Sequence, residues 1–227
     1  MDNTRSDVAG TAGRCGLFAG IGRGDLESLF SCLGARVVKI DKGRAFIRVG
    51  DKADRFGVVL LGSLSVVQYD AEGRRTIVKN ISESDLVGAA QALAGVQSFA
   101  FDVEADEPAE VLVMRTARIL APCENACRFH ARLVRNLMSS FAAKTLELNR
   151  KIDILSRRTT AEKLLTYLRG VAAERGTREF DIPFDRQQLA DFLCVERSAL
   201  SAEISRLVRI GSFGCHKNHF KLYQGGI

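Results

Sequence analysis

A heptad pattern of small and apolar residues runs from about Glu124 to Leu155, and it limits the possible folds of this chain more than any other feature. Its members follow each other in steps of four and three: Cys127, Ala131, Val134, Met138, Phe141, Thr145, Leu148, Ile152 and Leu155. Pro122 precedes the pattern and no proline or glycine interrupts it, so it predicts one helix of about 32 residues, or about 48 Å. Such a helix needs a partner. It is either a core helix of its own domain or, as we favour, half of a parallel coiled coil at a dimer axis.

The composition is that of a globular protein with a basic C-terminal end. The 227 residues suffice for one large domain or two ordinary ones, and 46% of them are apolar. The net charge is +6, and the basic excess lies after about residue 128. This asymmetry is typical of nucleic-acid binding, or of a solvated basic surface. The chain has no apolar run near the ~20 residues that span a bilayer and no signal peptide, so we expect a cytoplasmic protein without membrane association and with reduced cysteines.

The segment 35–114 changes to short runs of β-branched and aromatic residues with a period of two. Turn signals separate these runs, with Gly43 and Gly73 among the natural turn positions. Strands at this spacing, mostly without helices between them, predict an antiparallel roll or barrel. The exception is the segment 84–94, where small residues predict a short helix entered through Gly88.

The segment 181–213 is the most informative part of the chain. Asp185 is expected to cap a short helix, and a second helix from Arg197 to Val208 follows after a tight turn. Two short helices joined in this way predict a helix-turn-helix. The next residues, SFGCHKNHFKLYQ, contain a glycine turn and alternate in character, which predicts a β-wing. The C-terminal part is therefore expected to be a winged helix-turn-helix.

These elements together resemble a known family. The glycine turns in LLGSLSVVQYDAEGR and ISESDLVGA, the long helix, and the segments FDRQQLADFLCVERSALSAEISRL and KNHFKLY are similar to the CRP/FNR family of bacterial transcription regulators, particularly members from anaerobic Gram-positive bacteria. The resemblance implies an α+β fold with an N-terminal antiparallel, jelly-roll-like β-roll, a long dimerisation helix and a C-terminal winged helix-turn-helix. We expect an effector-sensing domain at 1–121, the dimerisation helix at 122–156 and a DNA-binding domain at 157–227.

The resemblance places the N-terminal half of the second helix of the helix-turn-helix in the major groove. Arg197 is the main candidate for reading a base, because a guanidinium can bind guanine through two hydrogen bonds. The other candidates for base or phosphate contacts, each of which is otherwise a solvated side chain, are Ser198, Ser201, Glu203, Arg186, Gln187, Lys217 and Asn218. The family often carries an arginine where this chain has Ala202, so the target need not be the family consensus.

The sensory site differs from that of cyclic-nucleotide-binding members, for which the resemblance implies a Gly-Glu pair on the ribose and an Arg-Ser pair on the cyclic phosphate. Here Gly88 is followed by Ala89, and the second pair falls near Ser98 and Phe99. A cyclic phosphate needs a positive partner, so cAMP and cGMP are not expected. The candidates for a small apolar pocket, or alternatively for ordinary core, are Gly88, Ala89, Ala90, Leu93, Phe99, Phe101, Phe129, Leu133 and Leu137. An aromatic or otherwise lipophilic metabolite would fit such a pocket.

The long helix carries both the predicted dimer interface and an alternative sensor. The interface consists of Cys127, Val134, Met138, Phe141, Thr145, Leu148 and Ile152. Cys123, Cys127 and His130 share one face of the helix, and thiols and imidazole can bind zinc or haem iron. A regulator that senses thiol redox state, metal or haem is therefore the alternative. Cys15 and Cys32 lack the close spacing of the family's iron-sulfur members, so no cluster is expected.

We predict a homodimeric, one-component transcription regulator that binds a palindromic promoter site and contacts RNA polymerase. An unidentified small-molecule effector between the roll and the long helix would control it by changing the spacing of the two recognition helices, and no cofactor is certain. An enzyme, or a sensory module without DNA binding, is the alternative from another class. The sequence has no glycine-rich phosphate loop and no nucleophile motif, and it has three histidines, which argues against an enzyme.

Overall fold

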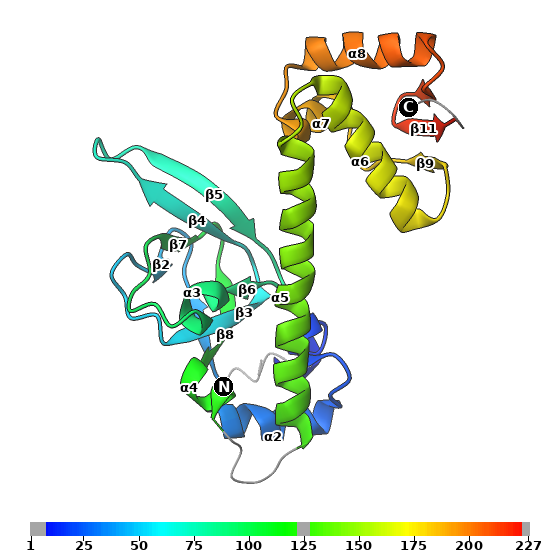
Figure 1. The fold of residues 1–227 in the computed structure, drawn as a ribbon. Coiled ribbons are helices and arrows are strands. Elements are labelled where there is room, and N and C mark those ends of the chain that lie inside the picture. Colours follow the sequence, from blue (N-terminus) through cyan, green and yellow to red (C-terminus); the bar gives the residue numbers. More distant parts are fainter. Residues whose placement is uncertain (1–7, 122–127, 224–227) are drawn as a thin grey trace. The chain divides into compact units, whose positions relative to one another are not determined.

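The computed structural model describes residues 8–121 and 128–223 of the chain. It divides into two compact units, Met1–Phe141 and Ala142–Ile227, and each unit is described by itself. The division falls within one continuous helix, α5, which runs from Arg128 to Leu155 (Figure 1). The predicted boundaries at about residues 121 and 156 differ from this division, and the three-part domain scheme stays a prediction.

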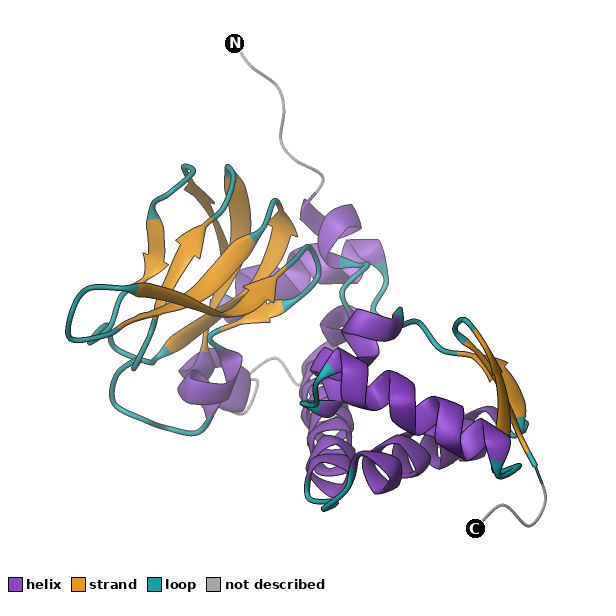
Figure 2. Cartoon of the chain, turned by 90° about the horizontal axis from the view of Figure 1, so that it is seen from above, coloured by secondary structure: helices purple, strands orange, loops and turns teal. Residues whose placement is uncertain are grey.

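The N-terminal unit contains two antiparallel sheets of four strands each (Figure 2). The first sheet has the order β1-β8-β3-β6, with β1 at Arg36–Ile40, β8 at Ala109–Arg115, β3 at Arg55–Leu61 and β6 at Leu86–Val87. The second has the order β2-β7-β4-β5, with β2 at Ala45–Ile47, β7 at Asp102–Ala105, β4 at Leu64–Tyr69 and β5 at Arg75–Ile81. This arrangement confirms the predicted antiparallel roll.

A core of branched apolar side chains joins the two sheets. Val59 and Val111 from the first sheet pack in one cluster with Leu64 and Val103 from the second, and each of the four is at most 1% exposed. Gly57 lies in the middle of β3, where a Cβ would be 2.3 Å from Cγ1 of Val111. Glycine at this point therefore lets β3 approach β8 closely.

The opposite face of the first sheet is covered by helices. These are α1 (Val8–Ala12), η1 (Gly16–Phe18), α2 (Arg23–Leu33), α3 (Ala89–Leu93), α4 (Thr116–Leu120) and the first part of α5. Phe56 and Met114 of the sheet lie in a second core with Leu29 of α2 and Leu133 of α5. Because β3 and β8 are buried on both faces, their sequences are nearly continuous apolar runs rather than alternating ones.

Helix α5 has 28 residues, which corresponds to about 42 Å. It begins at Arg128 in the described part of the chain, whereas the heptad pattern predicted a start near Glu124. The predicted residues Cys123 and Cys127 lie outside the described residues, as does Pro122.

The C-terminal unit is a winged helix-turn-helix, as predicted. It consists of the end of α5, α6 (Thr160–Arg175), β9 (Glu179–Asp181), α7 (Arg186–Leu193), α8 (Arg197–Arg209), β10 (Phe213–His216) and β11 (His219–Leu222). The three strands form one antiparallel sheet in the order β10-β11-β9. Capping boxes at Thr159 and Asp185 fix the starts of α6 and α7, and Gly176 ends α6 with a positive φ of 65°.

Candidate functional site

The helix-turn-helix is formed by α7, α8 and a short turn at residues 194–196. Cys194 adopts a left-handed conformation with a φ of 52°, and its N–H donates to the carbonyl of Ala190. Ala190 itself is fully buried, which lets α8 lie close to α7. Leu200, Ile204 and Leu207 are the buried residues of α8. The opposite side of α8 is therefore free to contact another molecule.

The exposed face of α8 carries the predicted base-reading residues and three that the sequence analysis missed. Arg197 and Ser198 are exposed, and Ser201 is half-buried. The missed residues, all exposed, are Ser205, Arg206 and Arg209. Their helical spacing from Ser198 would have identified them, since residues at steps of three and four share one helix face.

The charged side chains of α8 differ in whether they form ion pairs within the protein. Arg206 forms an ion pair with Glu203, with 2.6 Å between Nη2 and Oε1. The hydrogen bond from Arg206 lowers the pKa of the Glu203 carboxyl. A direct base contact by Glu203 would have to break this pair. No described residue forms an ion pair or hydrogen bond with the guanidinium of Arg197. Arg197 and Arg209 therefore lie on this surface without an ion pair among the described residues, and of the two it is Arg197 that lies at the N-terminal end of α8.

The other predicted contact residues lie around the turn of the wing. Arg186 Nη2 donates to the carbonyl of Lys217 at 3.2 Å, and Asn218 Nδ2 donates to the carbonyl of Ile182 at 3.1 Å. Gln187 donates to a carboxylate oxygen of Asp191 on its own helix at 2.8 Å. Arg186 and Asn218 thus hold the wing in place, while the Lys217 side chain is exposed at its tip. A hollow of about 450 Å³ lies here, lined by residues 183–186, Gln188, Lys217 and Asn218.

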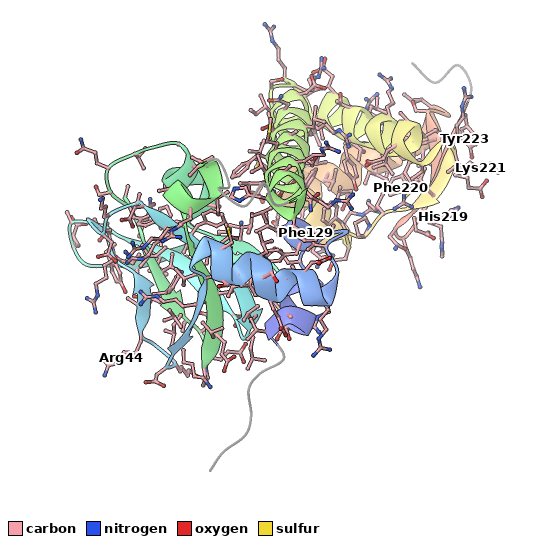
Figure 3. All side chains as sticks on the ribbon, turned by 90° about the horizontal axis from the view of Figure 1, so that it is seen from below. Arg44, Phe129, His219, Phe220, Lys221 and Tyr223 are labelled. Atoms are coloured by element: carbon pink, nitrogen blue, oxygen red, sulfur yellow. The ribbon has the colours of Figure 1, made fainter. Side chains whose placement is uncertain are left out.

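A charge network links β11 to β9 on the outer side of the wing sheet. His219 lies between two carboxylates, with Nδ1 2.9 Å from Asp181 Oδ1 and Nε2 3.3 Å from Glu179 Oε1. Lys221 is 2.8 Å from the other oxygen of Glu179. In Figure 3 His219 and Lys221 extend outward from β11, whereas Phe220, which is fully buried, is directed to the helices. Hydrogen bonds to Asp181 and then Glu179 raise the pKa of His219, and Lys221 and then His219 lower that of Glu179.

We expect the contribution of His219 to stability to fall as pH rises. Because folding raises the pKa of His219 above its ordinary value of 6.5, the stabilisation is complete below that value. It is lost as pH rises through the folded-state pKa, since the neutral ring no longer attracts both carboxylates. The Tm of the wild type should therefore exceed that of His219→Gln in mildly acidic buffer, and the difference should shrink toward alkaline pH. Thermal unfolding monitored by circular dichroism across this range tests the expectation.

Lys221→Met is the matched control, because a lysine on the same carboxylate stays charged throughout the neutral range. Its Tm difference from the wild type should stay constant over the same buffers. A His219→Gln difference that is equally independent of pH would contradict the assigned role of the imidazolium.

The predicted effector residues are divided between two cores of the N-terminal unit. Phe99 and Phe101 pack in the core between the two sheets. The residues that pack in the core on the helical side are Ala89, Leu93, Phe129, Leu133 and Leu137. Ala90 is exposed. The structure therefore does not gather the nine residues around one described cavity, and their role in effector binding stays a prediction.

Gly88 lies in the chain just before α3, next to residues of the core between the two sheets. It has a φ of 76° and precedes α3, as the sequence predicted for the entrance to a short helix. A Cβ at this position would be 3.1 Å from Ile47 and 3.2 Å from Phe99. The turn is therefore packed directly against the core between the sheets, and a larger residue than glycine would disturb that core.

The predicted metal set is not assembled in the described part of the chain. His130 is 7% exposed, and its Nε2 is 2.6 Å from the carbonyl of Ile119, which fixes the ring on the end of α4. Its Nδ1 has no hydrogen-bond partner among the described residues. Residues 8–121 and 128–223 contain no group of three or more histidine, cysteine or carboxylate side chains placed to hold a metal ion. Cys15 is buried, and burial raises the pKa of its thiol, which disfavours the reactive thiolate.

The seam of α5 has two different environments. Val134 and Phe141 are half-buried against the helical-side core of the N-terminal unit. Met138, Leu148 and Ile152 are 68%, 52% and 64% exposed. The remaining predicted interface residues are Thr145, which is exposed, and Cys127, which lies outside the described residues. The exposed residues belong to the row that the heptad pattern assigned to a dimer interface, and this assignment stays a prediction.

Comparison with known proteins gives the same architecture. A family model described as the cyclic nucleotide-binding domain matches residues 37–125. The transcriptional activator protein FnrL of Cereibacter sphaeroides is 27% identical over 179 residues, which cover 74% of this chain and 68% of that protein. A probable transcriptional activator of Rhizobium leguminosarum bv. viciae is 25% identical over 193 residues, which cover 76% and 71%. The crystal structure of DNR from Pseudomonas aeruginosa has the same fold, with a TM-score of 0.52 and 19% identity over 99% of this chain and 97% of that one.

A sensory domain joined to a winged helix-turn-helix is the architecture of a DNA-binding transcription regulator, and this is the class of the chain. Residues 37–125, which form most of its sensory domain, match the cyclic nucleotide-binding domain.

The same relatives bear on two further expectations, namely which bacteria the most similar members come from and whether the protein is an enzyme. The expected closeness to members from anaerobic Gram-positive bacteria is not supported, since these two relatives come from Gram-negative proteobacteria. The relatives are transcription regulators rather than enzymes.

No helix within the described ranges combines the length and the apolar character that crossing a bilayer requires.

Proposed function

We propose that the protein is a homodimeric, one-component regulator of the CRP/FNR family that binds palindromic promoter DNA in the cytoplasm under the control of a small effector. The observation that carries this proposal is the exposed face of α8, where Arg197 has no partner among the described residues and lies beside Ser198. A recognition helix with a free guanidinium near its N-terminus is suited to bind a guanine edge in the major groove.

The wing and α7 would bind the DNA backbone. Lys217 at the tip of the wing is exposed, and Arg186 and Asn218 hold that tip through its backbone. We therefore assign phosphate contact to Lys217, and to Arg186 and Asn218 the task of presenting it. Gln187, Ser201 and Glu203 complete the proposed surface, with Glu203 acting through its pair with Arg206.

Dimer formation would bury the exposed row on α5. Met138, Leu148 and Ile152 are the large apolar residues of this row, with Thr145 between them. Two such rows in a parallel coiled coil would place the two α8 helices on successive major-groove faces, about 34 Å apart. An effector that favours one arrangement of the two α5 helices would then shift the population able to bind DNA. Binding next to a promoter would bring the dimer to RNA polymerase.

The effector would bind at α3 and the adjacent face of α5. Ala89 stands where an acidic ribose ligand would be needed, and Phe99 stands near the position of a phosphate-binding arginine, so we propose a ligand other than cAMP or cGMP. An aliphatic and an aromatic side chain, Ile47 and Phe99, lie next to Gly88, and the following Ala89 packs in the helical-side core. These surroundings favour an aromatic or otherwise lipophilic metabolite.

Selection of DNA by the purified protein tests the proposal. The full chain is incubated with a library of duplexes that contain randomised palindromes, at moderate salt and with or without cell extract. We expect enrichment of one palindrome whose half-site centres are about one helical turn apart. Failure to enrich any palindrome under either condition would refute the proposed function. Native mass spectrometry of the freshly purified protein would show the dimer and any retained effector.

A further inference from the structure

The C-terminal end of α7 borders the turn of the helix-turn-helix, and its last four carbonyls lack partners within the helix. Backbone groups of the turn satisfy the first two. Cys194 N–H donates to the carbonyls of Ala190 and Asp191, and Val195 N–H donates to that of Ala190 at 3.0 Å. The chain ends α7 in this way and turns toward α8, but the last two carbonyls are left to other partners.

Two lysines from other helices satisfy these two carbonyls. Lys151 on α5 donates from Nζ to the carbonyl of Phe192 at 2.7 Å. Lys163 on α6 donates from Nζ to the carbonyl of Leu193 at 3.3 Å. Positive charge at the C-terminal end of a helix is also favoured by the helix dipole. The turn that leads to α8 is thus attached to α5 through one side chain and to α6 through another.

Lys151 is attached to Phe192 a second time, through the ring. Its Nζ lies 3.6 Å from the centroid of the Phe192 ring, which is cation–π geometry. That ring stacks on Phe184 at 4.9 Å and lies 5.2 Å from the ring of Tyr167. The contacts with these two rings also hold the Phe192 ring in place. Lys151 therefore contacts α7 at a site with little freedom to adjust.

The end of α5 belongs to the same compact unit as the helix-turn-helix. Ile154 is 7% exposed and packs in the C-terminal core, and Lys151 lies one turn earlier on the helix. Apart from the connection through residues 156–159, the contact at Lys151 is a direct link from α5 to the turn before α8.

We propose that Lys151 is a positioning residue that transmits a displacement of α5 to the recognition helix. It acts by holding the C-terminal end of α7, so the direction of α8 follows the end of α5. This inference rests on the proposed function in one respect, namely that α8 reads DNA. It leads to two expectations, of which only the second involves DNA.

The first experiment measures amide hydrogen exchange in the full chain without DNA. In Lys151→Met, which keeps the aliphatic length and removes the charge and donor, we expect the amides of residues 193–197 to exchange about tenfold faster than in the wild type. Lys144→Met is the matched control, because Lys144 is also on α5 and pairs with Glu147 within that helix. Equal exchange in both variants would overturn the proposal whether or not the protein binds DNA.

The second experiment compares the duplex selected by the wild type with a scrambled duplex of equal length. We expect Lys151→Met to lower the ratio of the two affinities about tenfold with little change in Tm, and Lys151→Arg to retain most of the ratio, because a guanidinium can donate to the carbonyl and stack on the ring. A ratio equal to that of Lys144→Met, or an equal weakening on both duplexes, would contradict transmission through Lys151. A wild type that selects no duplex would instead refute the proposed function. The hydrogen-exchange experiment would still test whether Lys151 holds the C-terminal end of α7.

Discussion

Replacing Ile152 with glutamate should separate the protein into monomers and weaken its binding to the selected palindrome by at least about 100-fold. Ile152 is 64% exposed in the single chain, in one row with Leu148 and Met138. A coiled coil would bury this side chain against its counterpart, and two carboxylates facing each other there would be desolvated without a partner. Sedimentation velocity gives the mass in solution, and fluorescence anisotropy gives the affinity for DNA.

Leu146→Glu is the matched control for this prediction. Leu146 is 58% exposed on the same helix, but it lies off the heptad seam. The same charge at this position should leave the dimer and its DNA affinity nearly unchanged. Monomers in the wild type, or equal effects of the two variants, would show that the seam is not the dimer interface. Because both residues are exposed in the single chain, circular dichroism should show the wild-type helix content in each variant.

The helix-turn-helix could be predicted from the sequence because its determinants are local. Asp185 begins α7 through a capping box with Gln188, and both residues are visible in the sequence at the required spacing of three. Leu200, Ile204 and Leu207 recur with helical periodicity and are the buried residues of α8. Where the residues that fix an element are within a few positions of each other, the pattern alone specifies it.

The distribution of burial between different cores could not be predicted. Phe99 and Leu133 are both fully buried, as the effector prediction required, but one packs between the sheets and the other against the helices. Val134 and Phe141 were assigned to the dimer seam, yet they are also half-buried on the N-terminal unit. Periodicity predicts that a side chain is buried, but it does not predict which part of the protein the side chain packs against.

The hydrogen-bond partners of polar side chains could not be predicted from the sequence either. Arg186 and Asn218 were predicted to contact phosphate, but they bond to backbone carbonyls far away in the sequence. The contact of Lys151 with Phe192 joins residues 41 positions apart. Such pairs follow from tertiary packing, and the sequence around each residue carries no signal of them. They are also the contacts that the proposed positioning of the wing and of α8 depends on.

Replacing Arg197 with alanine should remove most of the sequence preference while reducing binding to random DNA far less. One bidentate contact to guanine is worth about 1–3 kcal/mol of discrimination, so the affinity for the selected palindrome should fall about 5- to 160-fold for each half-site that Arg197 reads. Arg197 is at the first position of α8, is exposed, and has no partner among the described residues, so its removal costs the free protein little. Competition between selected and scrambled duplexes in anisotropy measurements gives the ratio directly.

Arg209→Ala is the matched control, because it removes a positive charge from the same helix without removing the proposed base contact. Arg209 is also exposed, but it lies at the opposite end of α8. If it serves as a phosphate contact, its removal should weaken binding to both duplexes alike and reduce the slope of log affinity against log salt by about 1 for each phosphate that it neutralises. Arg197→Ala should instead leave that slope nearly unchanged for scrambled DNA. If Arg197→Ala weakens selected and scrambled duplexes equally, Arg197 is a phosphate contact, and the bases must be read by other residues on the exposed face of α8.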